Sequence, residues 1–257
     1  MKEILMILAA VLPAAAQSLN CNNRGVNNDR QATHCEMREQ TVPFAGRLSV
    51  DGGVNGGVTV TGWDNGNVLV RAKVEASGDD ESAARATVSQ ISLNLSAGQV
   101  TANGPTQSGR NGWQVSYEIF VPKQGDLSIK AHNGGISISD VRGTIQFETM
   151  NGGVNLKRVA GDVEGKTMNG GLNIELAGTR WDGTKLDART TNGGVNLAMP
   201  ENYSAHFESS TVNGHINIGV PVTAHGEISR QIVTDLGSGG PTIHVETING
   251  GVNVRKM

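Results

Sequence analysis

The chain has 257 residues, with 21 basic and 24 acidic side chains and a formal net charge of −3, so it offers no basic field that would attract nucleic acid. Nucleic acid is therefore excluded as an expected partner. Aromatic residues make up only 4% of the chain, which argues against a sugar-binding cleft lined by aromatic platforms.

The first 16 residues have the features of a secretory signal. Lys2 precedes an apolar run from Ile4 to Pro13, and small residues from Ala14 to Ala16 offer a cleavage site. The run is too short to span a membrane, and no second apolar stretch follows it. We therefore expect residues 1–16 to be removed, the product to be periplasmic or extracellular, and no transmembrane span.

The two cysteines, Cys21 and Cys35, both lie near the start of the expected mature chain, 14 residues apart. In an exported protein this pair favours a disulfide, worth roughly 3 kcal/mol for a loop of this size. A zinc site would need more ligands than these cysteines and His34 supply. We expect the disulfide to pin an N-terminal segment, residues 17–40, to the first strands of the domain that follows.

Residues 41–257 are expected to form one domain whose first half, 41–124, is irregular. Alternating segments predict strands at 47–60, 67–75, 91–103 and 113–121, and an acidic start with an Ala-rich interior predicts a short helix at 79–90. We expect this half to start the fold and to cap its open edge.

Residues 125–257 carry six copies of one short Asn-Gly phrase. The leading asparagines recur after 18, 18, 23, 21 and 36 residues, and such a period is typical of stacked repeats. Asn-Gly is also a strong tight-turn signal, because both residues tolerate positive φ. The six turn residues are Asn133, Asn151, Asn169, Asn192, Asn213 and Asn249.

Apolar and polar residues alternate before and after each phrase, which indicates strands with one buried and one exposed face. The fold class expected is all-β, a single-stranded β-solenoid with repeats of about 18 residues; a chain of independent hairpins is the rival interpretation. The Thr two residues before five of the six turns should face inward; these are Thr149, Thr167, Thr190, Thr211 and Thr247. The next residue should then face outward, so that Met150, Met168, Val212 and Ile248 form an apolar partner edge, unless the chain bends and returns them to the core.

A second outward column, after the turns, consists of asparagines that could hydrogen-bond from coil to coil or could bind a sugar chain. Two interruptions break the period. Residues 178–183 lengthen one unit, and residues 222–241 fill the place of a full unit without its phrase. Each is either a tolerated surface loop or a binding excursion. The asparagines of the second column are Asn155, Asn173, Asn196, Asn217 and Asn253.

Motifs that would indicate an enzyme, a calcium site or a phosphate loop are missing from the sequence. The six histidines have no metal-ligand spacing and are interpreted as isolated surface groups, so no metal and no cofactor is expected. The alternative is a polysaccharide lyase or hydrolase, which would use outward acids such as Glu164, Asp187 and Glu208. These acids alternate with Lys130, Lys166 and Arg189, a pattern that favours charge pairing between coils.

Several features together resemble a known family. Besides the signal and the cysteine pair, these are GWDNGNVLVRAKVEA from Gly62 to Ala76, YEIFVPKQGDLSIKAHNGGISI from Tyr117 to Ile138, and the closing GGPTIHVETINGGVNV. They are similar to the bacterial putative-adhesin proteins with β-strand repeats, a domain of unknown function. The resemblance implies a right-handed β-solenoid in a cell-envelope or secreted setting, and no catalytic residue.

The sequence thus predicts an exported, non-enzymatic putative adhesin or cell-envelope binding or structural protein. Its expected partners are an envelope protein, a surface glycan or another copy of itself.

Overall fold

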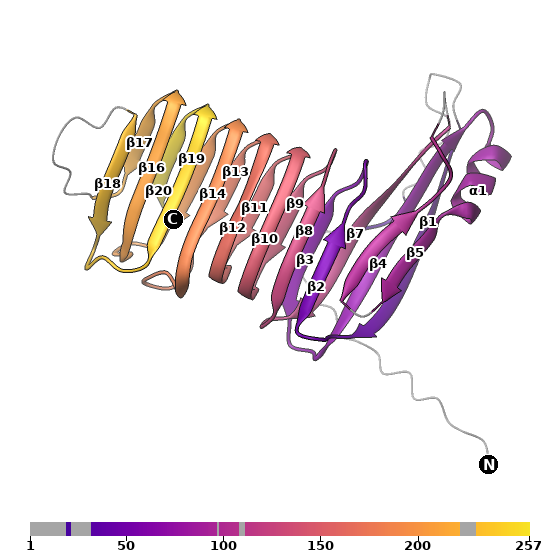
Figure 1. Cartoon of the computed structure of the whole chain (residues 1–257), viewed down its shortest axis with the longest axis horizontal. Coiled ribbons are helices and arrows are strands. Elements are labelled where there is room, and N and C mark those ends of the chain that lie inside the picture. The colour runs from indigo at the N-terminus through magenta and orange to yellow at the C-terminus, as the bar shows by residue number, and fades with distance from the viewer. Residues whose placement is uncertain (1–18, 22–31, 97, 108–110, 222–229) are drawn as a thin grey trace, which may run out of the picture.

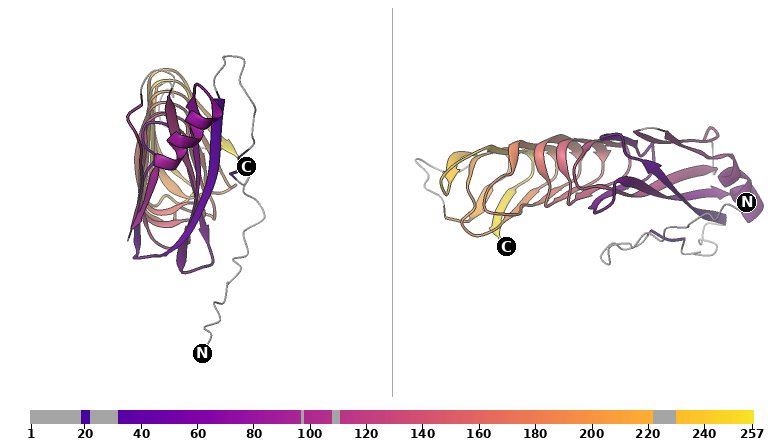
Figure 2. Two further views of the ribbon diagram at one scale, coloured as in Figure 1. Left: turned by 90° about the vertical axis from the view of Figure 1, so that its right-hand side faces the viewer. Right: turned by 90° about the horizontal axis from the view of Figure 1, so that it is seen from below.

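The computed structural model describes residues 19–21, 32–96, 98–107, 111–221 and 230–257. Within these residues the chain forms two ten-stranded β-sheets and one helix, arranged as an elongated stack (Figure 1). The two sheets lie face to face as a flattened coil with the apolar core between them (Figure 2). The expected signal peptide, residues 1–16, lies outside the described residues.

Each sheet takes its strands from the whole length of the domain. The first sheet, in spatial order, contains β1 (Ala32–Pro43), β4 (Asn67–Gly78), β7 (Gly112–Pro122), β3 (Val58–Trp63), β9 (Ile136–Ser139), β11 (Val154–Lys157), β13 (Leu172–Glu175), β15 (Val195–Met199), β20 (Val252–Lys256) and β17 (Ile216–Gly219). The second contains β18 (Gln231–Leu236), β16 (Ala205–Asn213), β19 (Thr242–Asn249), β14 (Gly183–Asn192), β12 (Ala160–Asn169), β10 (Arg142–Asn151), β8 (Asp126–Ala131), β2 (Arg47–Asp51), β6 (Gln99–Asn103) and β5 (Ser92–Ser96).

Each Asn-Gly-Gly phrase is a corner that passes the chain from the second sheet to the first. Neighbouring coils pair in parallel and in register, so that Ile145 lies opposite Val163 and Asn151 opposite Asn169. Independent hairpins would instead pair consecutive strands antiparallel, and that rival interpretation is wrong for the repeats. The fold is therefore all-β and solenoid-like. Both sheets are nevertheless mixed, because antiparallel strands pair at both ends of the stack, so the single-stranded solenoid expected as the fold class does not describe the ends.

The coils do not stack in sequence order. The last coil, β19 and β20, lies between the coil of β14 and β15 and the coil of β16 and β17. Strand β18 pairs antiparallel with β16 at the end of the second sheet. The expectation that residues 222–241 fill the place of a full unit is therefore wrong. Residues 231–236 of this stretch form an end strand, and residues 222–229 lie outside the described residues.

The irregular first half forms the other end of the stack, and most of its elements match the expected ones. Helix α1 (Glu81–Gln90) begins at Asp80, whose carboxylate accepts a hydrogen bond from the Ala83 amide at 2.8 Å. Near its C-terminus, the guanidinium of Arg38 donates to the carbonyl of Val88 at 2.9 Å. Arg38 belongs to β1, a twelve-residue edge strand that the sequence pattern did not predict.

The first glycine of each corner is required for a different reason from the one expected. At Gly152 an added Cβ would lie 2.1 Å from the carbonyl oxygen of Gly134 in the neighbouring coil, and the other repeat corners show the same close approach. None of these first glycines has a φ in the left-handed region. Close packing of one coil on the next, rather than a positive φ, therefore selects glycine here.

The insertion at 178–183 is not merely a surface loop. Trp181 is buried, and its indole Nε1 donates to the carbonyl of Gly161 at 3.1 Å. The side chain thus fills part of the core beside the coil it lengthens, which argues against this insertion as a freely exposed binding excursion.

Candidate binding edge

The residue immediately before each corner asparagine faces out along one rim of the stack, which we call the corner edge. In spatial order the corner edge consists of Val54, His132, Met150, Met168, Thr191, Ile248 and Val212. Its apolar side chains are exposed by 39% at Met150, 48% at Met168, 40% at Ile248 and 52% at Val212. The alternative that these side chains fold back into the core is wrong.

The corner edge contains most of the large apolar side chains that are exposed in the described part of the protein. Eight large apolar side chains are exposed in the described part of the protein, and five of them lie in this one row. Val54 is the fifth and most exposed member, at 59%. The sequence interpretation did not include Val54, although the phrase NGGVTV that follows it resembles the repeat and could have revealed it.

The threonine that precedes five of the seven edge residues fixes this orientation. Thr167 is buried, and its hydroxyl donates to the carbonyl of Gly152 in the preceding coil at 2.8 Å; the equivalent threonines make the same bond. Because successive side chains of a strand point to opposite faces, an inward threonine directs the next residue outward. The inward threonine column predicted from the sequence is thus present.

Two asparagine ladders stiffen the rim. In the corner column each side-chain amide donates to the asparagine of the next coil, as Asn169 does to Asn151 at 2.7 Å, and the row continues through all six repeats and Asn55. In the second column Asn173 donates to Asn155 at 3.0 Å, and Asn196 donates to Asn173. The amides of both rows serve the stack, which favours the structural ladder over a sugar-binding row.

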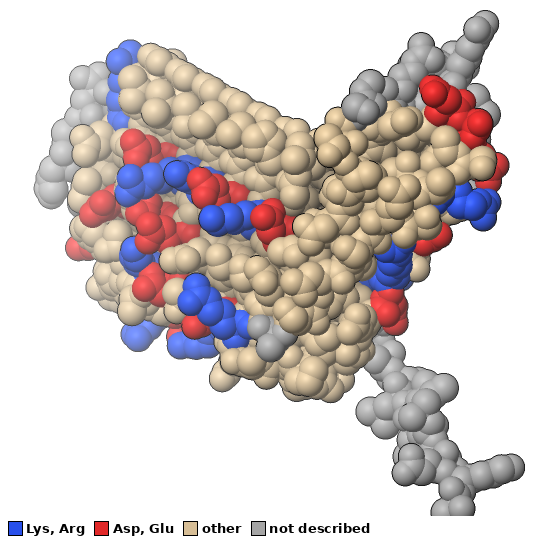
Figure 3. Space-filling view, turned by 45° about the vertical axis from the view of Figure 1, so that its right-hand side comes forward, with Lys and Arg blue, Asp and Glu red and all other residues tan. Residues whose placement is uncertain are grey.

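A row of charged side chains, which we call the charge row, runs beside the corner edge on the second sheet. In spatial order it consists of Lys130, Glu148, Lys166, Arg189 and Glu246, and the same column continues to Asp51 beside Lys130 and to Ser210 beside Glu246. A shallow hollow of about 490 Å³ lies between the two rows. In Figure 3 a band of Lys, Arg, Asp and Glu side chains crosses the stack below an upper rim that is mostly uncharged.

Charges in this band are paired with one another. Lys166 contacts Glu148 at 3.2 Å, and Lys185 contacts Glu164 at 2.8 Å. Burial raises the pKa of the Asp187 carboxyl, but hydrogen bonds from Arg189 and His244 outweigh burial, so the pKa lies below its usual value. A glycosidase general acid needs a raised pKa. Asp187 is therefore poorly suited to that role.

Three histidines contact acids, so the interpretation of all six as isolated surface groups is wrong for these three. His244 bonds Asp187 at 2.9 Å. His206 of β16 bonds Asp235 of β18 at 2.7 Å, and that hydrogen bond raises the imidazole pKa. His34 lies 3.7 Å from Glu36. Among the described residues no group of three or more His, Cys, Asp and Glu side chains is placed to hold a metal ion.

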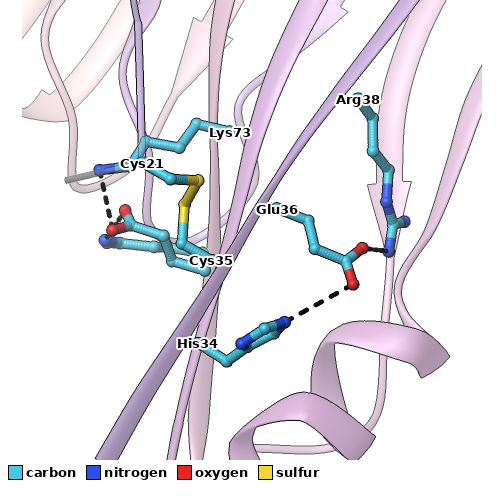
Figure 4. The surroundings of a disulfide bond; sticks show 8 residues. Cys21, His34, Cys35, Glu36, Arg38 and Lys73 are labelled. Carbon is cyan, nitrogen blue, oxygen red and sulfur yellow. Dashed lines mark hydrogen bonds and ion pairs between the residues drawn. A yellow bond between two sulfur atoms is a disulfide. The ribbon is translucent and has the colours of Figure 1, made fainter. Parts of the chain in front are cut away.

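The structure joins Cys21 to Cys35 of β1, with Cα atoms 5.7 Å apart (Figure 4). Glu36 follows on the same strand and forms an ion pair with Arg38 at 3.1 Å. The disulfide thus ties the chain around residue 21 to an edge strand at the N-terminal end of the stack. No helix in the described ranges is long and apolar enough to cross a membrane.

Comparison with known proteins gave matches to a family and to solved structures. The family described as Toastrack DUF4097 matches residues 57–255. No curated protein matches the chain. A putative cell adhesion protein from Clostridium sporogenes shares 14% identity over 87% of this chain and 100% of its own, with a TM-score of 0.44.

Two further structures are a putative adhesin from Bacteroides fragilis (13% identity, 86% of this chain and 97% of its own, TM-score 0.45) and a putative lipid binding protein from Parabacteroides distasonis (8% identity, 86% and 96%, TM-score 0.30). At these values the likeness indicates neither ligand nor partner. The family match spans more than half of the chain and agrees with the observed solenoid-like fold. The chain belongs to the Toastrack DUF4097 family.

Proposed function

We propose that this protein is an exported, non-enzymatic scaffold of the cell envelope, of the adhesin type, that binds a partner along its corner edge. In this proposal residues 1–16 are a signal peptide, residues 17–40 are a disulfide-pinned segment and residues 41–257 are a right-handed solenoid domain. The pairing of Cys21 with Cys35 supports an oxidising compartment, because disulfides persist outside the cytosol.

One observation carries the binding role: of the eight large apolar side chains exposed among the described residues, five occupy a single row. Isolated apolar residues are normal on a surface, but an ordered row of them marks an interaction site. The rim at the opposite corner of the coil has a different character, since Arg158 bonds Asp140 there at 2.7 Å and also contacts Glu175. The two rims of the stack are therefore chemically distinct, and the apolar one is the candidate surface.

The rigidity of the corner edge favours binding. Its strands are hydrogen-bonded on both sides, and the asparagine ladder links one coil to the next. A surface that is already ordered loses little conformational entropy when a partner docks. Methionine side chains adapt to the shape of an apolar partner, which favours a protein over a glycan as the ligand.

The test replaces Met150 and Met168 by Ser in the purified mature protein and measures retention on immobilised envelope extract. We expect retention to fall while the melting temperature stays within a few degrees, because both side chains are already exposed. Met37→Ser is the matched control, since Met37 has a similar exposure, 38%, but lies on β1. Unchanged retention of the double variant, or equal loss in the control, would refute the role of the edge.

A further inference from the structure

The order of charges in the charge row depends on the position of the last coil, which lies between two coils that are consecutive in the sequence. Read along the stack, its charges are positive at Lys130, negative at Glu148, positive at Lys166 and Arg189, and negative at Glu246. If the coils followed the sequence, Ser210 would occupy the place after Arg189. Only the observed order puts an acidic residue at the fifth position.

This order is complementary to itself when reversed. A two-fold axis running along β12 would place a second copy face to face with the first, with its stack in the opposite direction. Lys130 would then face Glu246 of the second copy, and Glu148 would face Arg189. Two such contacts of each kind arise, because a two-fold interface repeats every contact. At the ends of the column the acidic Asp51 would face the uncharged Ser210, so no like charges meet there.

Two further points support this arrangement: the central lysine of the charge row has a partner in its own chain, and docking with both stacks in the same direction is unfavourable. Lys166 lies on the axis and would meet its own copy, but it is already paired with Glu148 at 3.2 Å. Docking with both stacks in the same direction would instead set each charge against an identical one. Like charges placed against each other cost several kcal/mol, so the reversed orientation is selected.

The same axis also matches the corner edge. Met168 would pack on its own copy and Met150 would face Thr191. At the outer positions His132 would face Ile248, and Val54 would face Val212. Exposed apolar side chains are thus buried along the whole row, with charged contacts beside them, which is the arrangement of an apolar interface core with a polar rim.

We infer that the partner of the corner edge is a second copy of this chain, docked antiparallel about an axis along β12. The inference rests on the proposed binding role of the edge and specifies its occupant. It assigns the charge row the role of fixing orientation and the corner edge the role of supplying the buried apolar surface.

The experiment uses charge reversal in the purified mature protein, with Lys130→Glu and Glu246→Lys prepared as separate variants. Each variant alone places like charges at both symmetric contacts, and we expect its self-association to weaken by at least about tenfold. An equimolar mixture restores opposite charges at both contacts, and we expect 1:1 heterodimers. Mass from light scattering over a concentration series and native mass spectrometry of the mixture measure both results.

Complementation separates a specific interface from simple damage to the fold, because two misfolded variants would not rescue each other. Glu246 lies 3.8 Å from Arg189 in the same chain, so its reversal could disturb the coil. The pair Glu148→Lys and Arg189→Glu gives a second test with the same expected complementation; Glu148 and Arg189 also have partners in their own chain, Lys166 at 3.2 Å and Asp187 at 2.9 Å, so complementation in the mixture is the deciding result.

A wild-type protein that stays monomeric at all concentrations would overturn the inference, as would mixtures that form no heterodimer. Either result leaves the proposed function testable by itself. If the chain is monomeric but the methionine double variant loses retention on envelope extract, then a different envelope protein occupies the edge. If neither association nor retention is observed, both proposals fail.

Discussion

Alanine at the first glycine of a corner should disrupt the stack, whereas alanine at the second glycine should be tolerated. In Gly152→Ala the new Cβ would lie 2.1 Å from the carbonyl oxygen of Gly134, and ordinary contact begins near 3.4 Å. The two coils would have to separate by about 1.3 Å, against a normal strand spacing of about 4.8 Å. In Gly153→Ala the nearest atom, the carbonyl oxygen of Gly171, is 3.5 Å away, which is an ordinary contact.

The magnitude follows from the hydrogen bonds that this separation would break. Three hydrogen bonds to backbone carbonyls join the two corners: from the Asn151 backbone amide to His132 at 2.7 Å, from the Ile136 amide to Gly153 at 3.0 Å, and from the Thr149 hydroxyl to Gly134 at 2.9 Å. At about 1 kcal/mol for each bond, Gly152→Ala should cost about 3 kcal/mol. For a domain of this size that corresponds to a fall of roughly 6 to 12 °C in melting temperature.

The control variant should behave differently at the adjacent position. Gly153→Ala also removes backbone freedom from the unfolded chain, which offsets small losses, so its free energy of unfolding should change by less than about 1 kcal/mol. Circular dichroism during heating and in denaturant gives the midpoints, which are compared directly because stacked repeats need not unfold in two states. Equal midpoints for the two variants would show that coil spacing does not select the first glycine.

Three further predictions concern other parts of the stack. Thr167→Val should cost about 1 to 2 kcal/mol, because a buried glycine carbonyl loses its hydroxyl donor; chemical denaturation measures the loss, and Thr167→Ser should retain most of the stability. The raised pKa of His206 means that its bond to Asp235 stabilises β18 fully below about pH 6.5 and is lost as the pH rises through the folded-state pKa; the protection factors of the β18 amides, which correct for the base catalysis of hydrogen exchange, should therefore be lower at pH 8 than at pH 6. Deleting Val154 to Gly171 keeps every column in place, but it brings Ala188 next to Phe147, whose ring in the intact protein packs over Gly165. The shortened protein should therefore have a lower melting temperature, and Ala188→Gly in the same variant should recover part of the loss.

The columns of the repeats could be predicted from the sequence because a strand has a period of two. Leu127, Ile145 and Val163 follow that period and are buried, and the threonine before each edge residue is inward. Exposure of Met150 and Met168 follows from the same alternation. These features depend only on neighbours within one coil, which is the information that a local pattern carries.

Two features at the margins of the repeats depend on contacts that no local pattern contains. Strand β1 has few apolar residues, and it becomes a strand because its whole length pairs with β4, from Ala32 opposite Gly78 to Pro43 opposite Asn67. Trp181 lies in what reads as a loop, but it is buried with its indole bonded to another coil. A tryptophan within a polar insertion was the available signal, and composition alone did not reveal its partner.

The order of the coils could not be predicted because the repeats are interchangeable. Five of the six copies present the same inward threonine, and all six present the same corner asparagine and close-packed glycine, so β19 makes the same kind of contacts to β14 as to β16. Register is therefore determined within each pair of coils, while the succession of coils is set by the connections and by the end strand β18. The exchange has a chemical consequence. It places Ile248 between Thr191 and Val212 and Glu246 beside Arg189, so the order of the charges on the surface proposed for binding follows from the spatial order of the coils and not from the order of the sequence.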